Sequence, residues 1–333
     1  MPEGSPSRHL VAPELLPALA LLPQLELDEP LLAMIRAARP GERGIPLPEL
    51  TTEQSAIRCE ERFVAGRAGA PDVRVLVYTP PAATYGRPAY LHFHGGGFVM
   101  GTPEINNGSN RDIALTHDCV VVSVDYRLAP ETRWTGSYED NYAALAWLHR
   151  EADALGIDPA RVAIGGESAG GGHAAALGLI ARDRGEYPVC FQLLDCPMLD
   201  DRTCASPDPH RFAGEFIWTR GSNRFGWRSL LGEEPGGSDV PRAAVPARAA
   251  DLSGLPPTFI SIGALDLFLE ENLEFARRLA RAGVPVELHV IPGAFHGFSM
   301  AGQAAPQTQA LIRYRNDALA RAFARRDGDD ENG

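Results

Sequence analysis

Short apolar runs alternate with longer amphipathic stretches along most of the chain, beginning near Val73. The runs are rich in β-branched residues, as strands are, whereas stretches such as Leu267–Ala282 repeat apolar residues at helical spacing. Strands that alternate with helices indicate a mostly parallel sheet with crossover helices. The predicted strands are Glu61–Gly66, Val73–Thr79, Ala89–His94, Cys119–Asp125, Val162–Gly166, Val189–Asp195, Thr258–Gly263 and Val286–Ile291. The predicted helices are Glu104–His117, Tyr138–Leu155, Ala169–Asp183, Leu267–Ala282 and Gln307–Arg325.

Two segments do not fit this alternation. Residues 1–50 contain leucine-rich pieces interrupted by prolines, and residues 205–250 are too long for a simple connection between a strand and a helix. Because the second segment is rich in aromatic residues, we expect both to form a cap over a catalytic domain made of residues 51–204 and 251–326. Helices that only decorate the sheet would give the same pattern. The acidic residues 327–333 are predicted to be a disordered tail.

The composition is that of an ordinary globular protein. Of 333 residues, 44% are hydrophobic and 22% are charged, which argues against a disordered or fibrous chain. The formal net charge of −12 disfavours binding to nucleic acid or to an anionic membrane surface. No apolar run reaches the ~20 residues of a membrane span. The apolar stretch Val11–Leu25 is interrupted by prolines and lacks a preceding basic segment, unlike a signal peptide.

The chain contains no lysine, and all 31 basic residues are arginine. A P-loop, a Schiff-base enzyme and a Ser–Lys hydrolase each need a lysine, so these three classes of protein are excluded. The five cysteines include no Cys-x-x-Cys pair and are odd in number. This pattern indicates reduced thiols in a cytoplasmic protein.

A candidate nucleophile lies in the turn between a predicted strand and a predicted helix. Gly166-Glu167-Ser168-Ala169-Gly170 matches G-x-S-x-G, a pattern in which a tight turn raises the serine out of the chain. Side chains at Gly166 or Gly170 would collide with the flanking strand and helix. A purely structural turn rich in glycine would look the same, so the motif needs support from elsewhere.

That support comes from His94-Gly95-Gly96-Gly97-Phe98, which follows a predicted strand. Consecutive glycines let bare backbone N–H groups face a cavity, as an oxyanion hole requires. A phosphate-binding loop is disfavoured, because the run lacks G-x-G-x-x-G periodicity and the chain lacks lysine.

A serine hydrolase also needs a histidine that acts as base. Past Ser168, the histidines are His173, His210, His289 and His296. His173 falls on the helix that follows the serine and faces away from it, His210 opens the insertion, and His289 lies inside a strand. His296 follows the carboxyl end of a strand, where the sites of α/β proteins assemble, and is therefore the predicted base.

The acid that orients this base should also follow a strand. Asp266 does, whereas Glu270 and Glu271 lie about one turn into the next helix and are interpreted as solvated or capping charges. The chain order Ser168, Asp266, His296 is the one that α/β-hydrolases use.

With Asp125–Glu131, which reads DYRLAPE, these motifs resemble the hormone-sensitive-lipase-like branch of the α/β-hydrolases, which includes many bacterial carboxylesterases. The resemblance covers residues 60–325. It implies an α/β-hydrolase fold with a mostly parallel sheet of about eight strands, flanking helices and a helical cap. In that family Asp125 and Arg127 have structural roles, for which ion pairing is the simple interpretation, and Glu167 stands where aspartate is usual.

The resemblance also implies a role for each site residue. These are Ser168 as nucleophile, His296 as base, Asp266 as orienting acid, Gly96, Gly97 and Ala169 as N–H donors of the oxyanion hole, and His94, Gly95, Gly166, Glu167 and Gly170 as residues that shape the motifs.

We therefore expect a carboxylesterase that cleaves short- to medium-chain acyl esters through an acyl-enzyme, without a cofactor or a metal ion. Its substrate pocket is predicted to be lined by Phe98, Phe212, Phe216, Trp218 and Phe298. The same triad would serve an amidase, a lactonase or an acyltransferase, whereas a non-catalytic receptor of this fold is disfavoured by the presence of His296. A metal hydrolase built on His92 and His94 would need further ligands. Besides a small ester, the expected partner is a second copy of the chain, paired through the edge strand Val286–Ile291.

Overall fold

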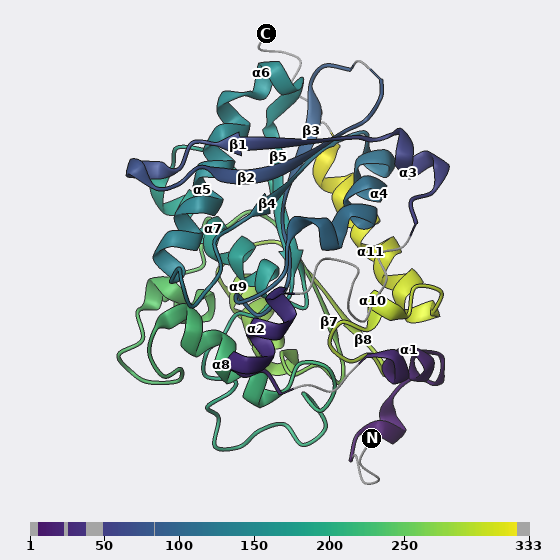
Figure 1. Cartoon of the computed structure of the whole chain (residues 1–333), viewed down its shortest axis with the longest axis vertical. Helices are drawn as coiled ribbons and strands as arrows, with labels where there is room; N and C mark the ends of the chain where they lie inside the picture. Colours follow the sequence, from purple (N-terminus) through teal and green to yellow (C-terminus); the bar gives the residue numbers. More distant parts are fainter. Residues whose placement is uncertain (1–5, 23–25, 38–48, 83, 325–333) are drawn as a thin grey trace.

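A sheet of eight strands runs through the computed structural model, which describes residues 6–22, 26–37, 49–82 and 84–324 (Figure 1). The strands are β1 (Arg58–Val64), β2 (Val73–Thr79), β3 (Arg87–Phe93), β4 (Val120–Asp125), β5 (Ile157–Glu167), β6 (Phe191–Asp195), β7 (Thr258–Gly263) and β8 (Val286–Ile291). Their order is β1-β2-β4-β3-β5-β6-β7-β8. β2 pairs antiparallel with β1 and with β4, and every later pair is parallel. The mostly parallel sheet predicted from the sequence is confirmed.

Helices cover both faces of this sheet. They are α1 (Leu16–Leu21), α2 (Glu29–Ala37), α3 (Thr52–Ala56), α4 (Asn107–His117), α5 (Trp134–Arg150), α6 (Ala152–Leu155), α7 (Ala169–Arg184), α8 (Arg220–Leu231), α9 (Leu269–Arg281), α10 (Phe298–Ala301) and α11 (Pro306–Phe323). In β2, Val75 and Val77 belong to a core cluster that includes residues of α5, α7 and α9, whereas Leu76 and Tyr78 belong to a cluster that includes residues of α4 and α11. Because successive strand residues face opposite sides, a strand buried on both faces must be apolar throughout.

The two segments outside the alternation meet at one end of the molecule. Leu32 of α2 packs with Phe225 and Leu230 of α8, in a cluster that also contains Phe98 and Trp218. Figure 1 shows α2 beside α8, and α1 apart from them beside α10. The segment 1–50 therefore contributes to two places, although its residues 1–5, 23–25 and 38–48 lie outside the described part, as does the tail 327–333.

Several boundaries differ from the predicted ones. β1 begins at Arg58, three residues before the predicted strand, and the predicted helix Tyr138–Leu155 is in fact α5 followed by the short α6. α5 begins earlier, at Trp134, and includes Gly136. Glycine is a poor helix former, but a Cβ on Gly136 would lie 2.4 Å from Thr132 Cγ2, so close packing explains its place in the first turns. In the described part of the chain, no helix is both long enough and apolar enough to cross a membrane.

Candidate active site

Ser168 occupies the junction between the end of β5 and the beginning of α7. Its backbone has φ 55° and ψ −120°, a conformation that residues with a side chain seldom adopt. Such strain persists only where the surroundings hold it. Here the Ser168 N–H donates to Asp195 O at 2.9 Å, and Ser168 O accepts from the Met198 N–H at 2.9 Å. The turn thus holds the serine against the loop that follows β6.

The glycines on either side of Ser168 are required by close packing. A Cβ on Gly166 would lie 2.2 Å from Phe93 O, and a Cβ on Gly170 would lie 2.0 Å from the same oxygen. Both distances are far below van der Waals contact. The end of β3 therefore passes so near the turn that only glycine fits at these two positions.

His296 and Asp266 reach the serine from the ends of two further strands. His296 Nε2 lies 3.0 Å from Ser168 Oγ, and His296 Nδ1 lies 2.7 Å from Asp266 Oδ2. Asp266 is held in turn by the Phe268 N–H, which donates to its Oδ1 at 3.0 Å. The exposed fractions are 8% for Ser168, 7% for His296 and 1% for Asp266, so the acid is the best shielded from water. This geometry can pass a proton from Oγ to Nε2 while the carboxylate steadies the imidazolium.

The glycine-rich loop passes directly beside the nucleophile. A Cβ on Gly95 would lie 3.5 Å from Ser168 Cβ. Gly96 and Gly97 have φ values of 128° and 59°, which favour glycine. α7 begins at Ala169, and the first N–H groups of a helix have no acceptor within it. The predicted oxyanion hole, with N–H donors from Gly96, Gly97 and Ala169, is compatible with this arrangement and stays a prediction.

His94 supports this loop from inside the protein. It is completely buried, its Nδ1 lies 2.8 Å from Gly95 O, and its ring stacks on that of Tyr126 with 4.3 Å between centroids. Burial lowers the pKa of His94 to about 4, so the ring is neutral at neutral pH. A neutral, packed His94 is suited to shaping the loop and not to proton transfer.

Glu167, just before the nucleophile, belongs to a buried polar group behind the turn. One carboxylate oxygen lies 3.0 Å from His92 Nε2 and accepts from Asn106 Nδ2 at 3.2 Å. Burial acts to raise the pKa of Glu167, but His92, through its charge and hydrogen bond, and Arg315, through its charge, together hold that pKa below its ordinary value. Since His92 Nδ1 also lies 2.9 Å from Ser123 Oγ, both nitrogens of His92 are engaged within the protein.

Of the aromatic residues predicted for the pocket, Trp218 lies against the triad and the glycine loop. Its ring centroid is 6.4 Å from that of His296, and a Cβ on Gly97 would lie 2.1 Å from its Cη2. The indole N–H donates to Asn223 Oδ1 at 3.1 Å, which fixes the ring. Trp218 therefore packs beside both the His296 ring and the glycine-rich loop.

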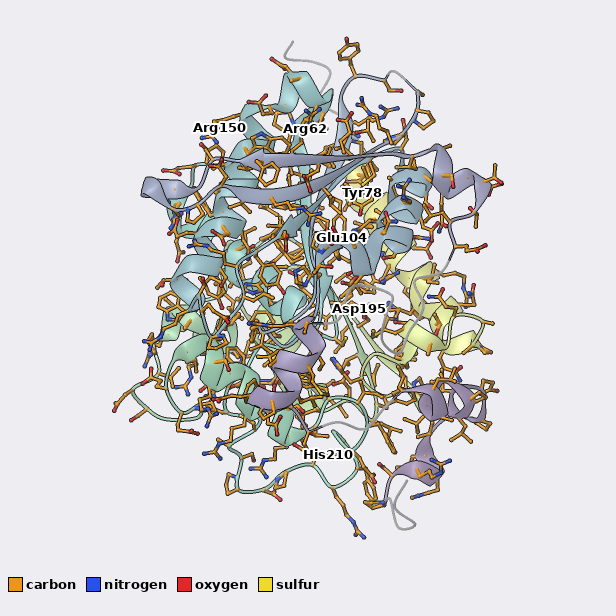
Figure 2. The ribbon with its side chains drawn as sticks, in the orientation of Figure 1. Arg62, Tyr78, Glu104, Arg150, Asp195 and His210 are labelled. Carbon is orange, nitrogen blue, oxygen red and sulfur yellow. The ribbon has the colours of Figure 1, made fainter. Side chains whose placement is uncertain are left out.

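The other four aromatic residues have different surroundings. Phe98 is 1% exposed and packs in the cluster between α2 and α8, whereas Phe216 and Phe298 belong to a separate cluster around α1 and α10. Phe212 is half-buried beside His210, with 6.4 Å between ring centroids, and Figure 2 shows His210 at the lower edge of the molecule. A role of these four residues in the substrate pocket stays a prediction.

Sequence reasoning missed one neighbour of the triad, Cys196. Its Sγ and ligand atoms of Asp266 and His296 all lie within 4.8 Å of one another. Burial raises the pKa of this thiol well above its ordinary value, and the charges of Asp195 and Asp266 add to that rise. A thiol, an imidazole and a carboxylate are zinc ligands in principle, but here the latter two already bond to each other. In the sequence, Cys196 could have been found only from its position directly after the carboxyl end of β6.

The interpretation of Glu271 as a solvated or capping charge is wrong. Glu271 is 7% exposed and accepts hydrogen bonds from the Leu199 N–H at 2.6 Å, the Asp200 N–H at 3.3 Å and the Thr203 hydroxyl. Burial raises the pKa of Glu271 well above its ordinary value, and the charge of Asp200 adds to this. The side chain thus ties α9 to the loop after β6.

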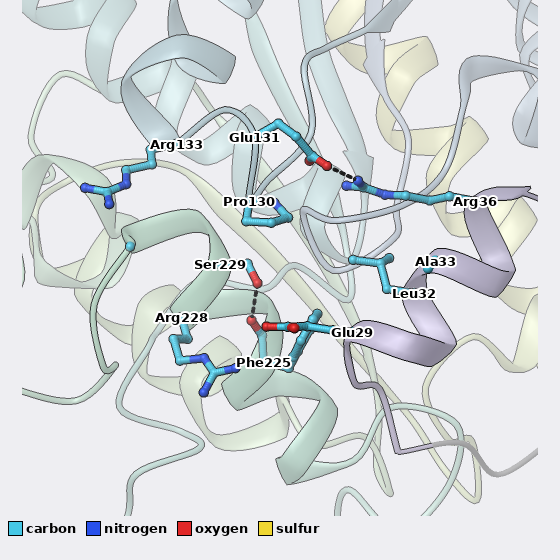
Figure 3. Close-up of a pocket in the computed structure, with 11 residues that line it drawn as sticks. Glu29, Leu32, Ala33, Arg36, Pro130, Glu131, Arg133, Phe225, Arg228 and Ser229 are labelled. Atoms are coloured by element: carbon cyan, nitrogen blue, oxygen red, sulfur yellow. Dashed lines mark hydrogen bonds and ion pairs between the residues drawn. The ribbon is translucent and has the colours of Figure 1, made fainter.

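A cavity of about 400 Å³ lies between α2, α8 and the loop after β4 (Figure 3). It is lined by Glu29, Leu32, Ala33, Arg36, Pro130, Glu131, Arg133, Phe225, Arg228, Ser229 and Gly232. This lining does not include Ser168, Asp266 or His296, so the cavity lies between α2, α8 and residues 130–133 and not at these three residues.

Comparison with known proteins agrees with this geometry. Residues 90–300 match a family described as alpha/beta hydrolase fold. Esterase LipI of Mycobacterium tuberculosis is 33% identical over 84% of this chain and 86% of its own length, and carboxylesterase NlhH of the same species is 36% identical over 75% and 77%. A solved structure titled Bacterial Heroin Esterase is 38% identical in sequence and superposes with a TM-score of 0.85. The alignment covers 95% of this chain and 99% of that one. The names of all three denote esterases.

Proposed function

Because the chain belongs to the hormone-sensitive-lipase-like α/β-hydrolases and is a carboxylesterase, we propose that it cleaves short- to medium-chain acyl esters through an acyl-enzyme formed on Ser168. The observation that carries this proposal is the chain of contacts from Ser168 Oγ to His296 Nε2 at 3.0 Å and from His296 Nδ1 to Asp266 at 2.7 Å.

In the first half-reaction, Ser168 Oγ attacks the ester carbonyl carbon while its proton passes to His296 Nε2. The carbonyl oxygen becomes an oxyanion, which accepts hydrogen bonds from the N–H groups of Gly96, Gly97 and Ala169. The intermediate then collapses, the bond from the carbonyl carbon to the alcohol oxygen breaks, and His296 protonates the departing alcohol.

In the second half-reaction, water takes the place of the alcohol. His296 accepts a proton from the water as its oxygen attacks the acyl-enzyme. The bond between the acyl group and Ser168 Oγ breaks, the proton returns to Oγ, and the carboxylic acid leaves. Asp266 stabilises the imidazolium in both halves.

The test is a series of p-nitrophenyl esters from acetate to palmitate, assayed with the wild-type protein and with Ser168→Ala. The proposal expects hydrolysis of the shorter esters by the wild type and none above background by the variant. Wild-type protein that is active while Ser168→Ala keeps more than a few per cent of that activity would remove Ser168 from the mechanism.

We further propose a cytoplasmic location, which is supported by the odd number of cysteines, five, and by the lack of any Cys-x-x-Cys pair in the sequence. Fractionation of the source cells tests it: recovery with a periplasmic or secreted marker enzyme would contradict the proposal.

The remaining proposal is a homodimer paired through β8. This strand lies at the edge of the sheet, and Val290 on it is 40% exposed. An edge strand offers unpaired backbone groups to a second copy of the same strand. Sedimentation velocity should show a dimer for the wild type and a monomer for Val290→Pro; a wild-type monomer at micromolar concentration would refute this pairing.

A further inference from the structure

An arginine of the N-terminal segment reaches from the cap into the core of the protein. Arg36, on α2, donates from Nε to Val99 O at 2.7 Å and from Nη2 to Ala129 O at 2.6 Å. Its Nη1 forms an ion pair with Glu131 at 2.7 Å, which Figure 3 shows as a dashed line. The side chain is 26% exposed, whereas Glu131 is 66% exposed. The two bonds to carbonyl groups are therefore the shielded part of this contact.

Both carbonyl groups belong to the framework of the glycine-rich loop. The N–H groups of Val99 and Met100 donate to Gly96 O at 3.1 Å and 3.0 Å, and the Ala129 N–H donates to Phe98 O at 3.0 Å. Arg36 thus joins the two chain segments whose mutual hydrogen bonds close the loop.

The loop that these contacts hold is strained. Gly96, Gly97 and Phe98 are three consecutive residues with positive φ, at 128°, 59° and 69°. The conformation of Phe98 is costly for a residue with a side chain, and such a conformation persists only when surrounding groups determine it. External hydrogen bonds to this loop are accordingly part of what keeps its N–H groups in place.

Helix α8 and Trp218, which precedes it, pack against the loop from another direction. A Cβ on Gly226 of α8 would lie 2.6 Å from Gly97 O, and the ring of Trp218 lies against Gly97. The loop is therefore confined between the two parts of the cap. α8 and Trp218 supply packing contacts, and Arg36 supplies hydrogen bonds.

We infer that Arg36 is a positioning residue for ester hydrolysis: it holds the loop that presents the N–H groups of Gly96 and Gly97 to the oxyanion. This inference rests on the proposed function, since it presumes the oxyanion hole described above. A planar guanidinium can donate to two carbonyl groups in fixed directions, which a lysine ammonium cannot reproduce. The N-terminal helix then contributes to the rate of the chemical step as well as to substrate selection.

The experiment compares four variants in the full-length protein with p-nitrophenyl butyrate. Arg36→Ala removes the two hydrogen bonds and the ion pair of Arg36. Arg36→Lys keeps the positive charge but cannot donate to both carbonyl groups in the directions that the guanidinium uses. Glu131→Gln removes only the exposed ion pair. Arg224→Ala is the matched control, because Arg224 is a cap arginine on α8 that is 56% exposed and pairs with Glu234 at 2.7 Å. Removal of an oxyanion donor, or its displacement by about 1 Å, costs about 10²-fold in rate.

We expect Arg36→Ala to lower kcat by about 10- to 100-fold while KM changes little, and Arg36→Lys to recover part of the loss. Inhibition by a trifluoromethyl ketone, which forms an oxyanion on the serine, should weaken in parallel with kcat/KM. Glu131→Gln and Arg224→Ala should stay close to the wild type. A residue that only stabilised the cap would instead change KM or the melting temperature and leave kcat and the ketone affinity unchanged.

The result that overturns the inference is a folded Arg36→Ala or Arg36→Lys with wild-type kcat and wild-type affinity for the ketone. If Arg36→Ala does not fold, Arg36→Lys carries the test, since it preserves the charge and most of the volume. Failure of the proposed function looks different, because then the wild-type protein itself would not hydrolyse the ester or react with a fluorophosphonate at Ser168.

Discussion

At the scale of single residues, the proposed mechanism depends on one oxygen atom, Oγ of Ser168. Replacing it in Ser168→Ala should lower turnover by about 10⁶, because a triad acts as a unit. Circular dichroism should show an unchanged fold, since the change removes one atom from a side chain with an exposed fraction of 8%. Substantial residual activity in a folded variant would assign the nucleophile elsewhere.

The orienting acid can be tested by comparing two carboxylates of the same segment. Asp266→Asn should lower kcat by about 10⁴, because an amide cannot hold the imidazole in the required tautomer. Glu270→Gln, four residues further on, should have little effect, because the hydrogen bonds of the Asp266 carboxylate in the described part of the chain go to His296 and the Phe268 N–H. Steady-state kinetics on both variants decides the matter, and the reverse outcome would transfer the role to Glu270.

Burial of Glu271 predicts a dependence of stability on pH. Its pKa in the folded protein is raised above 4.5. As the pH rises, Glu271 therefore loses its proton more readily in the unfolded chain than in the folded one. The folded state consequently loses stability as the pH rises from 4.5 toward the folded-state pKa of Glu271. Glu271→Gln does not ionise, and it should therefore gain stability relative to the wild type between pH 5 and pH 8. Thermal unfolding at both pH values measures the difference. Glu274→Gln, an exposed variant of the same helix, should not show this gain.

Which residues could be foreseen depends on how far apart their partners lie along the chain. Ser168, Asp266 and His296 each follow a strand in a short recognisable motif, and a parallel sheet brings such positions to one edge. Arg36 could not be foreseen, because its partner Val99 is 63 positions away and no local pattern specifies that contact. Cys196 follows the carboxyl end of β6, where site residues assemble, but no neighbour in the sequence would activate its thiol.

At the scale of elements, β-branched runs predicted the strands well, because a strand buried on both faces has no polar alternation to obscure it. Helix starts were less predictable. Gly136 breaks the helical pattern in sequence, yet α5 passes through it because Thr132 occupies the space of a side chain. The split of residues 1–50 between α8 and α10 was not foreseen, since both leucine-rich pieces are equally apolar.

The segment around α1 should affect both stability and catalysis. Leu15 is completely buried in a cluster with Phe295, which precedes His296, and the Ala12 N–H donates to Gly293 O at 3.0 Å. Leu15→Ala should lower the free energy of unfolding by about 2–5 kcal/mol and lower kcat as the loop of the base loosens. Leu21→Ala, on the same segment but 72% exposed, is the control that should change neither quantity.

At the scale of the whole molecule, the cap predicted for residues 1–50 and 205–250 should limit the length of the acyl chain. Each added methylene contributes up to about 0.8 kcal/mol, roughly fourfold in kcat/KM, until the chain meets a wall. We expect kcat/KM to rise over the shortest chains, to peak around butyrate to hexanoate and then to fall steeply. Kinetics over the ester series measures the profile, and a flat profile out to palmitate would mean that the cap encloses nothing.

The backbone of Ser168 has a consequence for the stability that this protein can reach. A residue held at φ 55° costs about 1–3 kcal/mol in strain, whereas glycine accepts that conformation and costs about 0.5–1 kcal/mol through its greater freedom in the unfolded chain. The inactive variant Ser168→Gly should therefore melt at a higher temperature than the wild type and than Ser168→Ala. Calorimetry measures this difference in melting temperature. A higher melting temperature for Ser168→Gly would mean that the serine needed for hydrolysis lowers the stability of the protein. Thermostabilising substitutions then have to be sought away from this turn.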